Sequence, residues 1–365
     1  MTINQQQILT PFDIGQVRLV NRLAVVPMTR ISASAEGVAS QRQVDYYERF
    51  AKGGFGLTIT EGIYTDQKFS QGYLFQPGIT DLEQAQAWHA VTNAVHKHDG
   101  KIFAQLMHAG ALSQGNRFSQ GTAGPSAVTP KGEQMGFYYG NGQYPNPRVM
   151  TEEDIADAID GFAKSAARAI EISGFDGVEI HGANGYLLDQ FLTDFSNQRT
   201  DKWGGDVRSR VRLTLEVYKA VRNAVGSATV GVRISQGKVN DFFHKWAEGE
   251  AGAEAVFGSL ADAGVDFIHV TEFEAWKPAF VEAGDSLVKL AHRYAPNQAI
   301  ISNGGLHQVD HIEEVLNDGA DVIALGKGAL ANPDFPQRFA NGAPLIEFDP
   351  SILGPIADIK DKELV

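Results

Sequence analysis

The sequence predicts an α/β fold in which eight parallel strands close into a (β/α)₈ TIM barrel. Three observations predict it: short apolar runs alternate with longer segments of helical spacing, the runs are apolar throughout, and eight of them occur in 365 residues. Alternation implies a parallel sheet, and continuous apolar runs imply strands covered on both faces. The predicted strands are residues 23–29, 56–62, 101–107, 176–182, 229–235, 265–271, 299–305 and 320–326. A doubly wound open sheet is the alternative, but eight such units in residues 1–365 favour a single closed domain.

The predicted helices lie between these runs, and the clearest begins after Thr151. Its hydroxyl can cap the helix, and "TEED" places the carboxylate of Asp154 three residues on, as in a capping box. Ile155, Ile159 and Phe162 then fall on one helical face. This segment is therefore expected to cover the barrel as an amphipathic helix.

Two segments interrupt the alternation. Residues 13–21, "DIGQVRLVN", predict a hairpin ahead of the first strand that plugs the bottom of the barrel. Residues 110–148 are rich in Gly, Pro, Ser and aromatic residues and predict a long loop after the third strand. A connection this long typically forms a lid or a binding wall, and a plain surface excursion is the alternative.

The composition restricts the chemistry and the partners. The chain has no cysteine, which excludes disulfides, thiolate metal sites, cysteine-ligated iron–sulfur clusters and a cysteine nucleophile. Its net charge of -13 is spread along the sequence, which disfavours nucleic acid and anionic membranes as partners. No run of about 18 apolar residues predicts a membrane span, and the first ten residues are polar. We therefore expect a cytoplasmic protein that acts on a small molecule.

Polar side chains and glycines stand where the predicted strands end. In a β/α barrel these ends converge on one mouth, where reactive groups lie. The strand ends carry Met28, Thr29, Glu61, Gly62, Gln105, His181, Asn184, Arg233, Asn303, Gly304, Gly305, Gly326 and Lys327. They show no metal-ligand spacing, and strands four to six show no lysine of the kind that a Schiff-base aldolase needs. Amides, a hydroxyl, an arginine and glycines instead suit a planar, heteroatom-rich molecule with a phosphate, such as a flavin.

The glycines of the last two strand ends favour phosphate binding. Gly304, Gly305, Gly326 and Gly328 allow backbone N–H groups to approach an anion, and Lys327 adds a counter-charge. Tight turns without a ligand are the alternative. The motif "GKGALA" also matches the dinucleotide fingerprint, but it follows the eighth strand with no further βαβ unit to hold a ribose.

The segment "HGANGYLLDQFL" follows the fourth predicted strand. His181 and Asn184 can both donate hydrogen bonds toward the barrel axis, which suggests a clamp for a carbonyl oxygen or an oxyanion. Tyr186 adds a phenol that can deliver a proton. A histidine that is satisfied within the structure is the alternative.

At these residues the sequence resembles the old yellow enzyme family of FMN-dependent ene-reductases and NAD(P)H:flavin oxidoreductases. The resemblance runs almost from end to end and is carried by "NRLAVVPMTR", "IFAQLMHAG", "GFDGVEIHGANGYLLDQFL", "DKWGGDVRSRVRLTLEV", "SNGG" and "ALGKGALANPDFPQR". It implies tightly bound, non-covalent FMN, NAD(P)H as the reductant, and ping-pong reduction of the C=C bond of α,β-unsaturated carbonyl or related nitro and quinone compounds. The family analogy allows monomers, dimers and tetramers, so a homo-oligomer is compatible with it.

The resemblance also implies a role for each matched residue. It implies that His181 and Asn184 bind the activating oxygen of the substrate and that Tyr186 is the proton donor. Thr29 is implied to lie at the flavin O4, and Arg233 at N1 and O2. The implied cofactor-binding residues along the ring are Pro27, Met28, Thr29, Gly62, Gln105 and Arg233. Those at the phosphate are Gly304, Gly305, Gly326 and Lys327, and Asn303 is a further implied cofactor-binding residue.

Two departures from the family pattern bear on these roles. Lys327 stands where the family usually has arginine, so the phosphate meets a point charge rather than a planar fork. The segment 235–246, "SQGKVNDFFHKW", replaces a shorter, proline-containing form, and its role is open. Two other functions also stay open: a phosphate-binding barrel isomerase or aldolase, and a flavin-binding protein without redox turnover.

Overall fold

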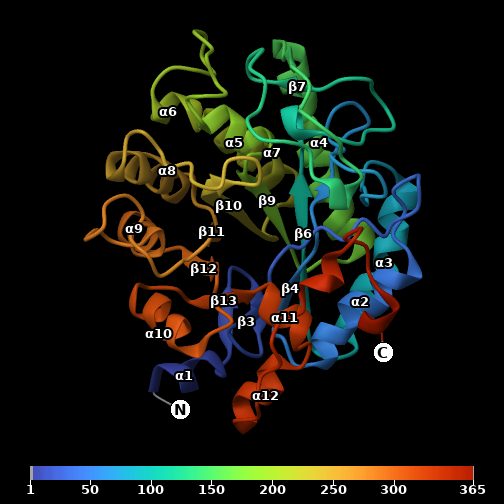
Figure 1. The fold of residues 1–365 in the computed structure, drawn as a ribbon, viewed down its shortest axis with the longest axis vertical. Coiled ribbons are helices and arrows are strands. Elements are labelled where there is room, and N and C mark those ends of the chain that lie inside the picture. The colour runs from blue at the N-terminus through green and yellow to red at the C-terminus, as the bar shows by residue number, and fades with distance from the viewer. Residues whose placement is uncertain (1–2, 365) are drawn as a thin grey trace.

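The computed structural model describes residues 3–364 and shows a closed barrel of eight parallel strands (Figure 1). In order round the barrel these are β3 (Leu23–Val25), β4 (Leu57–Ile59), β6 (Lys101–Met107), β9 (Gly177–Asn184), β10 (Thr229–Lys238), β11 (Phe267–Thr271), β12 (Ala299–Asn303) and β13 (Val322–Leu325). Pairing of β13 with β3 and of β4 with β6 closes the ring, and β5 (Ile63–Tyr64) adds a short parallel pairing to β6. The predicted fold class and all eight predicted strands are confirmed.

Helices pack around the outside of the barrel (Figure 1). The longer ones are α2 (Gln41–Lys52), α3 (Leu82–His96), α4 (Glu152–Arg168), α7 (Arg212–Val225), α8 (Glu250–Ala263), α9 (Leu287–Tyr294) and α10 (Val309–Asn317). The shorter ones are α1 (Ile3–Ile8), α5 (Leu187–Leu192), α6 (Val207–Arg210), α11 (Lys327–Ala331) and α12 (Phe335–Asn341), and a π-helical turn, η3 (Ala169–Ser173), continues α4. The predicted capping box of α4 is confirmed, because Thr151 and Asp154 each accept a hydrogen bond from the backbone N–H of the other.

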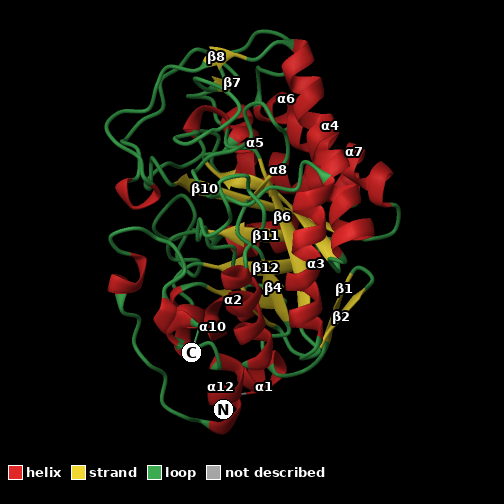
Figure 2. Cartoon of the chain, turned by 90° about the vertical axis from the view of Figure 1, so that its right-hand side faces the viewer, coloured by secondary structure: helices red, strands yellow, loops and turns green. Residues whose placement is uncertain are grey.

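The N-terminal hairpin closes the bottom of the barrel, as predicted. Its strands, β1 (Phe12–Ile14) and β2 (Val17–Leu19), are antiparallel. The turn between them binds the first residue of β10, since the N–H of Gln16 donates to Oγ1 of Thr229 at 3.0 Å. Ile14 and Leu19 are fully buried against side chains that fill the barrel interior, including the stacked rings of Phe103 and Phe267. Figure 2 shows this hairpin at the right edge of the molecule.

The long connection after β6 is also confirmed. Between residues 110 and 149 it contains only short elements: the 3₁₀ turns η1 (Gly110–Leu112) and η2 (Gly136–Tyr138), and the parallel two-residue pair β7 (Ala123–Gly124) and β8 (Arg148–Val149). Figure 2 shows β7 and β8 at the top left, away from the hairpin. The C-terminal segment adds the turns η4 (Pro350–Leu353) and η5 (Asp361–Glu363).

The strand lengths differ from those predicted, and one difference matters for the site. β3 ends at Val25, just before Pro27, which has no N–H for a ladder. β10 is longer than predicted: after an irregularity that follows Ile234 it continues to Lys238, which pairs with Asn184 of β9. The expectation that strands four to six carry no lysine is therefore wrong, because Lys238 lies in the fifth barrel strand. Within residues 3–364 no helix has the length and hydropathy needed to cross a membrane.

Candidate active site

A hydrogen-bonded polar layer lies inside the barrel between the apolar interior and the mouth. Nε2 of Gln105 donates to Glu179 at 2.7 Å, and the other oxygen of Glu179 lies 2.7 Å from Nδ1 of His269. Nε2 of His269 lies 2.9 Å from the side-chain oxygen of Asn303, which also accepts from Arg233 at 3.2 Å. Because each member comes from a different strand, the layer forms a fixed polar floor for the mouth.

Arg233 is a buried cation in this floor, and not all of its hydrogen-bond donors are used. Its Nη2 donates to Thr271 and to Asn303, both at 3.2 Å, while its Nε has no partner among the described residues. Burial lowers the pKa of Arg233, and the nearby carboxylate of Glu179 opposes that shift. A buried guanidinium with an unused N–H favours a ligand that presents an acceptor or negative charge.

His181 lies beside Arg233, because β9 and β10 place the two residues in register. The backbone N–H of Ala183 donates to Nδ1 of His181 at 3.3 Å, which assigns the ring proton to Nε2. Burial, together with the charge of Arg233 and the proximity of His269, holds the pKa of His181 well below its usual value. His181 is therefore a neutral imidazole with an N–H donor that no described residue uses.

Asn184 and Tyr186 complete the same wall. Asn184 ends β9 with φ +61°, and its backbone N–H donates to Oγ of Ser235 at 2.8 Å while its carboxamide has no partner among the described residues. Tyr186 is the N-cap of α5, and its ring centroid lies 5.0 Å from that of His181. Burial raises the pKa of Tyr186 to about 12, so the phenol carries its proton at neutral pH. The structure thus brings His181 and Tyr186 into contact, and Asn184 stands two residues before Tyr186 in the turn that joins β9 to α5.

A group of tyrosines that the sequence analysis missed packs against this wall. Tyr73 hydrogen bonds through its hydroxyl to the hydroxyl of Tyr186, and Tyr138 donates to the carbonyl oxygen of Thr29 at 3.1 Å. The hydroxyl of Tyr144 is buried and has no partner among the described residues. The only sequence signal for Tyr138 and Tyr144 was their place in the aromatic-rich loop, and Tyr73 carried none.

The predicted ring-binding segments border the mouth from the other side. Pro27, Met28 and Thr29 are half-buried. The loop that follows them is fixed by Glu61, which accepts from the N–H groups of residues 30 and 31 at 2.9 and 3.1 Å. Gly62 is buried, and a Cβ there would stand 2.4 Å from the sulfur of Met107, so glycine is required.

The two predicted phosphate loops lie next to each other at the ends of β12 and β13. Gly304 and Gly305 have φ of +135° and +68°, a region that favours glycine. A Cβ on Gly328 would lie 3.1 Å from His307 in the loop after β12, and one on Gly326 would lie 3.1 Å from Val26 after β3. Lys327 is exposed beside them. The side-chain oxygen of Asn303 belongs to the polar floor, where it lies within hydrogen-bond distance of Arg233 and His269.

The comparisons with known proteins agree with this geometry. The family model described as the NADH:flavin oxidoreductase / NADH oxidase family matches residues 7–345. The chain belongs to this family. It is 35% identical over 354 residues to 12-oxophytodienoate reductase 2 of Arabidopsis thaliana, covering 94% of this chain and 91% of the relative. It is 34% identical to a probable flavin mononucleotide-dependent alkene reductase of Leishmania infantum, with coverage of 94% and 93%. The solved old yellow enzyme homologue from Zymomonas mobilis superposes with a TM-score of 0.88 at 29% identity, covering 98% of each chain.

Membership of the old yellow enzyme family makes this chain an NAD(P)H-dependent FMN oxidoreductase, and the residues at the mouth fit FMN. The unused Nε of Arg233 and the unpartnered donors of His181 and Asn184 suit a ring edge and a substrate oxygen. Gly304 and Gly305 leave no room for a Cβ, because the backbone of Glu272 and the ring of Trp276 pack against them, and this packing fixes the loop at the end of β12. Within residues 3–364 no cluster of acidic and histidine side chains could hold a metal ion.

Proposed function

We propose that this chain uses NAD(P)H and bound FMN to reduce the C=C bond of α,β-unsaturated carbonyl compounds. One observation carries the proposal: His181 and Asn184 offer two unpartnered donors beside the protonated phenol of Tyr186. Two donors and one acid suit a substrate whose oxygen gains charge while its α-carbon needs a proton. Related nitro and quinone compounds offer the same kind of oxygen.

The protonation state of each side chain determines its proposed role in the reaction. FMN, when bound, would supply the redox chemistry as a carrier of hydride, that is two electrons with one hydrogen nucleus, between NAD(P)H and the β-carbon of the substrate. Nε2–H of His181 and the carboxamide of Asn184 orient the carbonyl and stabilise the negative charge that grows on its oxygen. Because the imidazole is neutral, it donates without giving up its proton. Tyr186 then delivers a proton to the α-carbon.

The cofactor is proposed to lie in one barrel domain that spans residues 1–365. Arg233 and Gln105 would hold the ring from the polar floor, and Pro27, Met28, Thr29 and Gly62 would border it. Gly304, Gly305, Gly326 and Lys327 would take the phosphate, with Asn303 holding Arg233 in place.

Steady-state kinetics test the proposal. Under anaerobic conditions the FMN-loaded protein is expected to oxidise more than one equivalent of NADPH or NADH per flavin only when 2-cyclohexenone is present, and to release cyclohexanone. Saturated cyclohexanone is the matched negative control. Flavin binding without enone-dependent turnover would instead favour a flavin-binding protein without redox function. An isomerase or aldolase is disfavoured because the one lysine in strands four to six, Lys238, is held by a buried carboxylate.

Three expectations stay predictions. They are a cytoplasmic location, the absence of nucleic-acid partners, and a state of assembly between monomer and tetramer. Fluorescent tagging, a DNA-binding assay and size-exclusion chromatography with light scattering test them in turn.

A further inference from the structure

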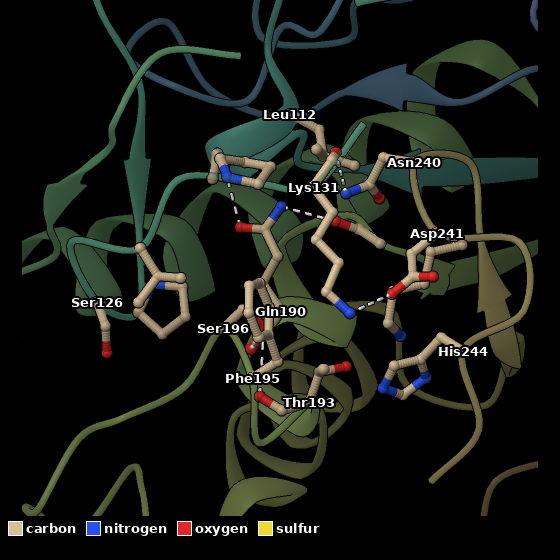
Figure 3. A pocket seen from close by; sticks show the side chains of 16 residues that line it. Leu112, Ser126, Lys131, Gln190, Thr193, Phe195, Ser196, Asn240, Asp241 and His244 are labelled. Carbon is tan, nitrogen blue, oxygen red and sulfur yellow. Dashed lines mark hydrogen bonds and ion pairs between the residues drawn. The ribbon is translucent and has the colours of Figure 1, made fainter. Parts of the chain in front are cut away.

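A cavity, drawn in Figure 3, borders the Asn184–Gly185–Tyr186 turn, since Gly185 is one of the residues that line it. Leu112, Gln190 and Asn240 are among the residues that line it. On its exposed side the ammonium group of Lys131 and the carboxylate of Asp241 form an ion pair at 2.8 Å, drawn as a dashed line in Figure 3. The enclosed space of about 40 Å³ admits water but is far smaller than a ligand site. The cavity is therefore not a second binding site.

Lys238 contributes to the wall of this cavity, and its ion pair is the notable feature of the region. The ammonium group of Lys238 lies 2.8 Å from both carboxylate oxygens of Asp189. The two side chains are 7% and 0% exposed, so the pair is buried. A buried carboxylate of this kind depends on its counter-charge, because the medium around it cannot replace water.

Asp189 connects this pair to the middle of the turn. One of its oxygens accepts from the backbone N–H of Gly185 at 2.6 Å, and the other accepts from the hydroxyl of Thr193 at 3.2 Å. Gly185 has φ +87° and stands between Asn184 and Tyr186. Any displacement of the Asp189 carboxylate therefore moves the peptide that joins the two proposed substrate-binding side chains.

The backbone of Lys238 holds the same turn from the opposite side. Lys238 pairs with Asn184 in the sheet, and the N–H of Val239 donates to the carbonyl oxygen of Asn184 at 3.1 Å. The side chain of Lys238 thus links the extension of β10 to α5, and the turn lies between them. This gives the unusual segment 235–246 a structural task.

We propose that Lys238 and Asp189 are positioning residues, and that their ion pair fixes the Asn184–Gly185–Tyr186 turn for reduction of the substrate. This inference rests on the proposed function, because the position of the turn affects the reaction only if Asn184 and Tyr186 act on the substrate. Besides each other, the two charged groups bond to the N–H of Gly185, the hydroxyl of Thr193 and the carbonyl oxygen of Gln236, and to no side chain of the proposed substrate site. A shift of about 1 Å in catalytic groups can lower the rate about 100-fold. Loss of an ion pair that fixes the turn is therefore expected to lower the rate measurably, even though the pair does not bind the substrate.

A single variant and its charge-compensated double variant test the inference on the FMN-loaded protein. Lys238→Met leaves the Asp189 carboxylate buried without its counter-charge, whereas Asp189→Asn together with Lys238→Met removes the charge and keeps an oxygen for the N–H of Gly185. In single-turnover reoxidation of the pre-reduced flavin by 2-cyclohexenone, Lys238→Met is expected to slow the reaction at least about 10-fold, and the double variant to recover most of the loss. If Lys238 acts only through the packing of its aliphatic chain, the rate of reoxidation is expected to fall equally in the single and the double variant.

The matched control is Lys131→Met, the same substitution at the exposed end of the same cavity. It is expected to keep the wild-type rate, because the side chains of Lys131 and Asp241 pair with each other and form no hydrogen bond to residues 184–186. A wild-type rate in Lys238→Met overturns the inference, and so does a double variant as slow as Lys238→Met. If Lys238→Met does not fold, the double variant must still fold and turn over for the inference to stand.

Amide hydrogen exchange of residues 183–189 gives a readout that does not depend on activity. Exchange is expected to be faster in Lys238→Met than in wild type and close to wild type in the double variant, at equal FMN content. Unchanged exchange in Lys238→Met also contradicts the inference. A wild-type protein that binds FMN but does not reduce 2-cyclohexenone overturns the proposed function instead, so the two failures are distinguishable.

Discussion

The hydroxyl groups of Tyr73 and Tyr186 are hydrogen bonded to each other at the wall of the barrel mouth. Both side chains are buried, and burial raises the pKa of each phenol, to about 12 for Tyr186 and well above the usual value for Tyr73. Tyr73 therefore holds Tyr186 in one orientation, with its proton in place. An oriented, protonated phenol is what a proton donor to carbon requires.

Replacing Tyr186 by phenylalanine removes this proton and little else. Reduction of 2-cyclohexenone by the pre-reduced protein is expected to slow by about 100-fold, whereas reduction of the flavin by NADPH keeps its rate, because that half-reaction needs no proton from Tyr186. Stopped-flow absorbance measures the two half-reactions separately.

Tyr73→Phe is the matched control for that variant. It leaves the Tyr186 phenol present but without its partner, so the loss is expected to stay below about 10-fold. Equal losses in both half-reactions of Tyr186→Phe would remove Tyr186 from the role of proton donor.

The low pKa of His181 predicts the sign of a stability change with pH. Unfolding returns the imidazole to its usual pKa near 6.5, so below about pH 6.5 the unfolded chain binds a proton that the folded chain does not. The free energy of unfolding contributed by His181 is therefore full above that pH and decreases as the pH falls. Thermal melts between about pH 8 and pH 5.5 should show a lower melting temperature at the acid end.

His181→Gln isolates this contribution. The variant is expected to show a shallower dependence of melting temperature on pH, although burial lowers the pKa of His269 as well and its contribution remains. A dependence that is identical in the two proteins would mean that folding does not change the pKa of His181.

Arg233 is expected to contribute strongly to FMN binding. Arg233→Met removes the buried cation, and the dissociation constant of FMN, measured by quenching of its fluorescence on titration with apoprotein, is expected to rise at least about 10-fold. Arg208→Met is a suitable control because that side chain is exposed. Equal affinity in the two variants would exclude Arg233 from the cofactor site.

Variants of Lys327 distinguish the contribution of the phosphate to FMN affinity from that of the flavin ring. Lys327→Met is expected to weaken FMN binding about 10-fold and to leave riboflavin binding unchanged, because riboflavin has no phosphate. Lys327→Arg is expected to bind FMN more tightly than wild type, since a planar fork donates two hydrogen bonds to a phosphate. A parallel loss for riboflavin and FMN in Lys327→Met would place Lys327 elsewhere.

The barrel and most of its mouth could be predicted from sequence because they depend on local signals. Each strand is a continuous apolar run, and the side chains at its end enter the mouth whatever the neighbouring strand is. His181, Asn184 and Tyr186 lie within six residues, so one turn brings them together. The resemblance to a known family supplied their proposed roles, which the residues alone left open.

What could not be predicted depends on partners that are distant in sequence. Lys238 follows Gln236 and Gly237, and this polar stretch predicts a loop. Lys238 is nevertheless part of a strand, because it pairs with Asn184 of β9. Its ion pair with Asp189 joins residues 49 positions apart. Tyr73 is likewise placed by packing against Tyr186, 113 positions away, and no pattern in "QGYLFQ" indicates this contact.

Anaerobic titration of the purified protein shows whether bound flavin carries hydride from NAD(P)H to an enone. The protein is expected to be yellow, and its flavin absorbance to be bleached by NAD(P)H and fully restored by 2-cyclohexenone, with cyclohexanone formed in equal amount. A colourless protein that FMN does not reconstitute, or a bleached flavin that the enone leaves unchanged, would contradict the proposed function.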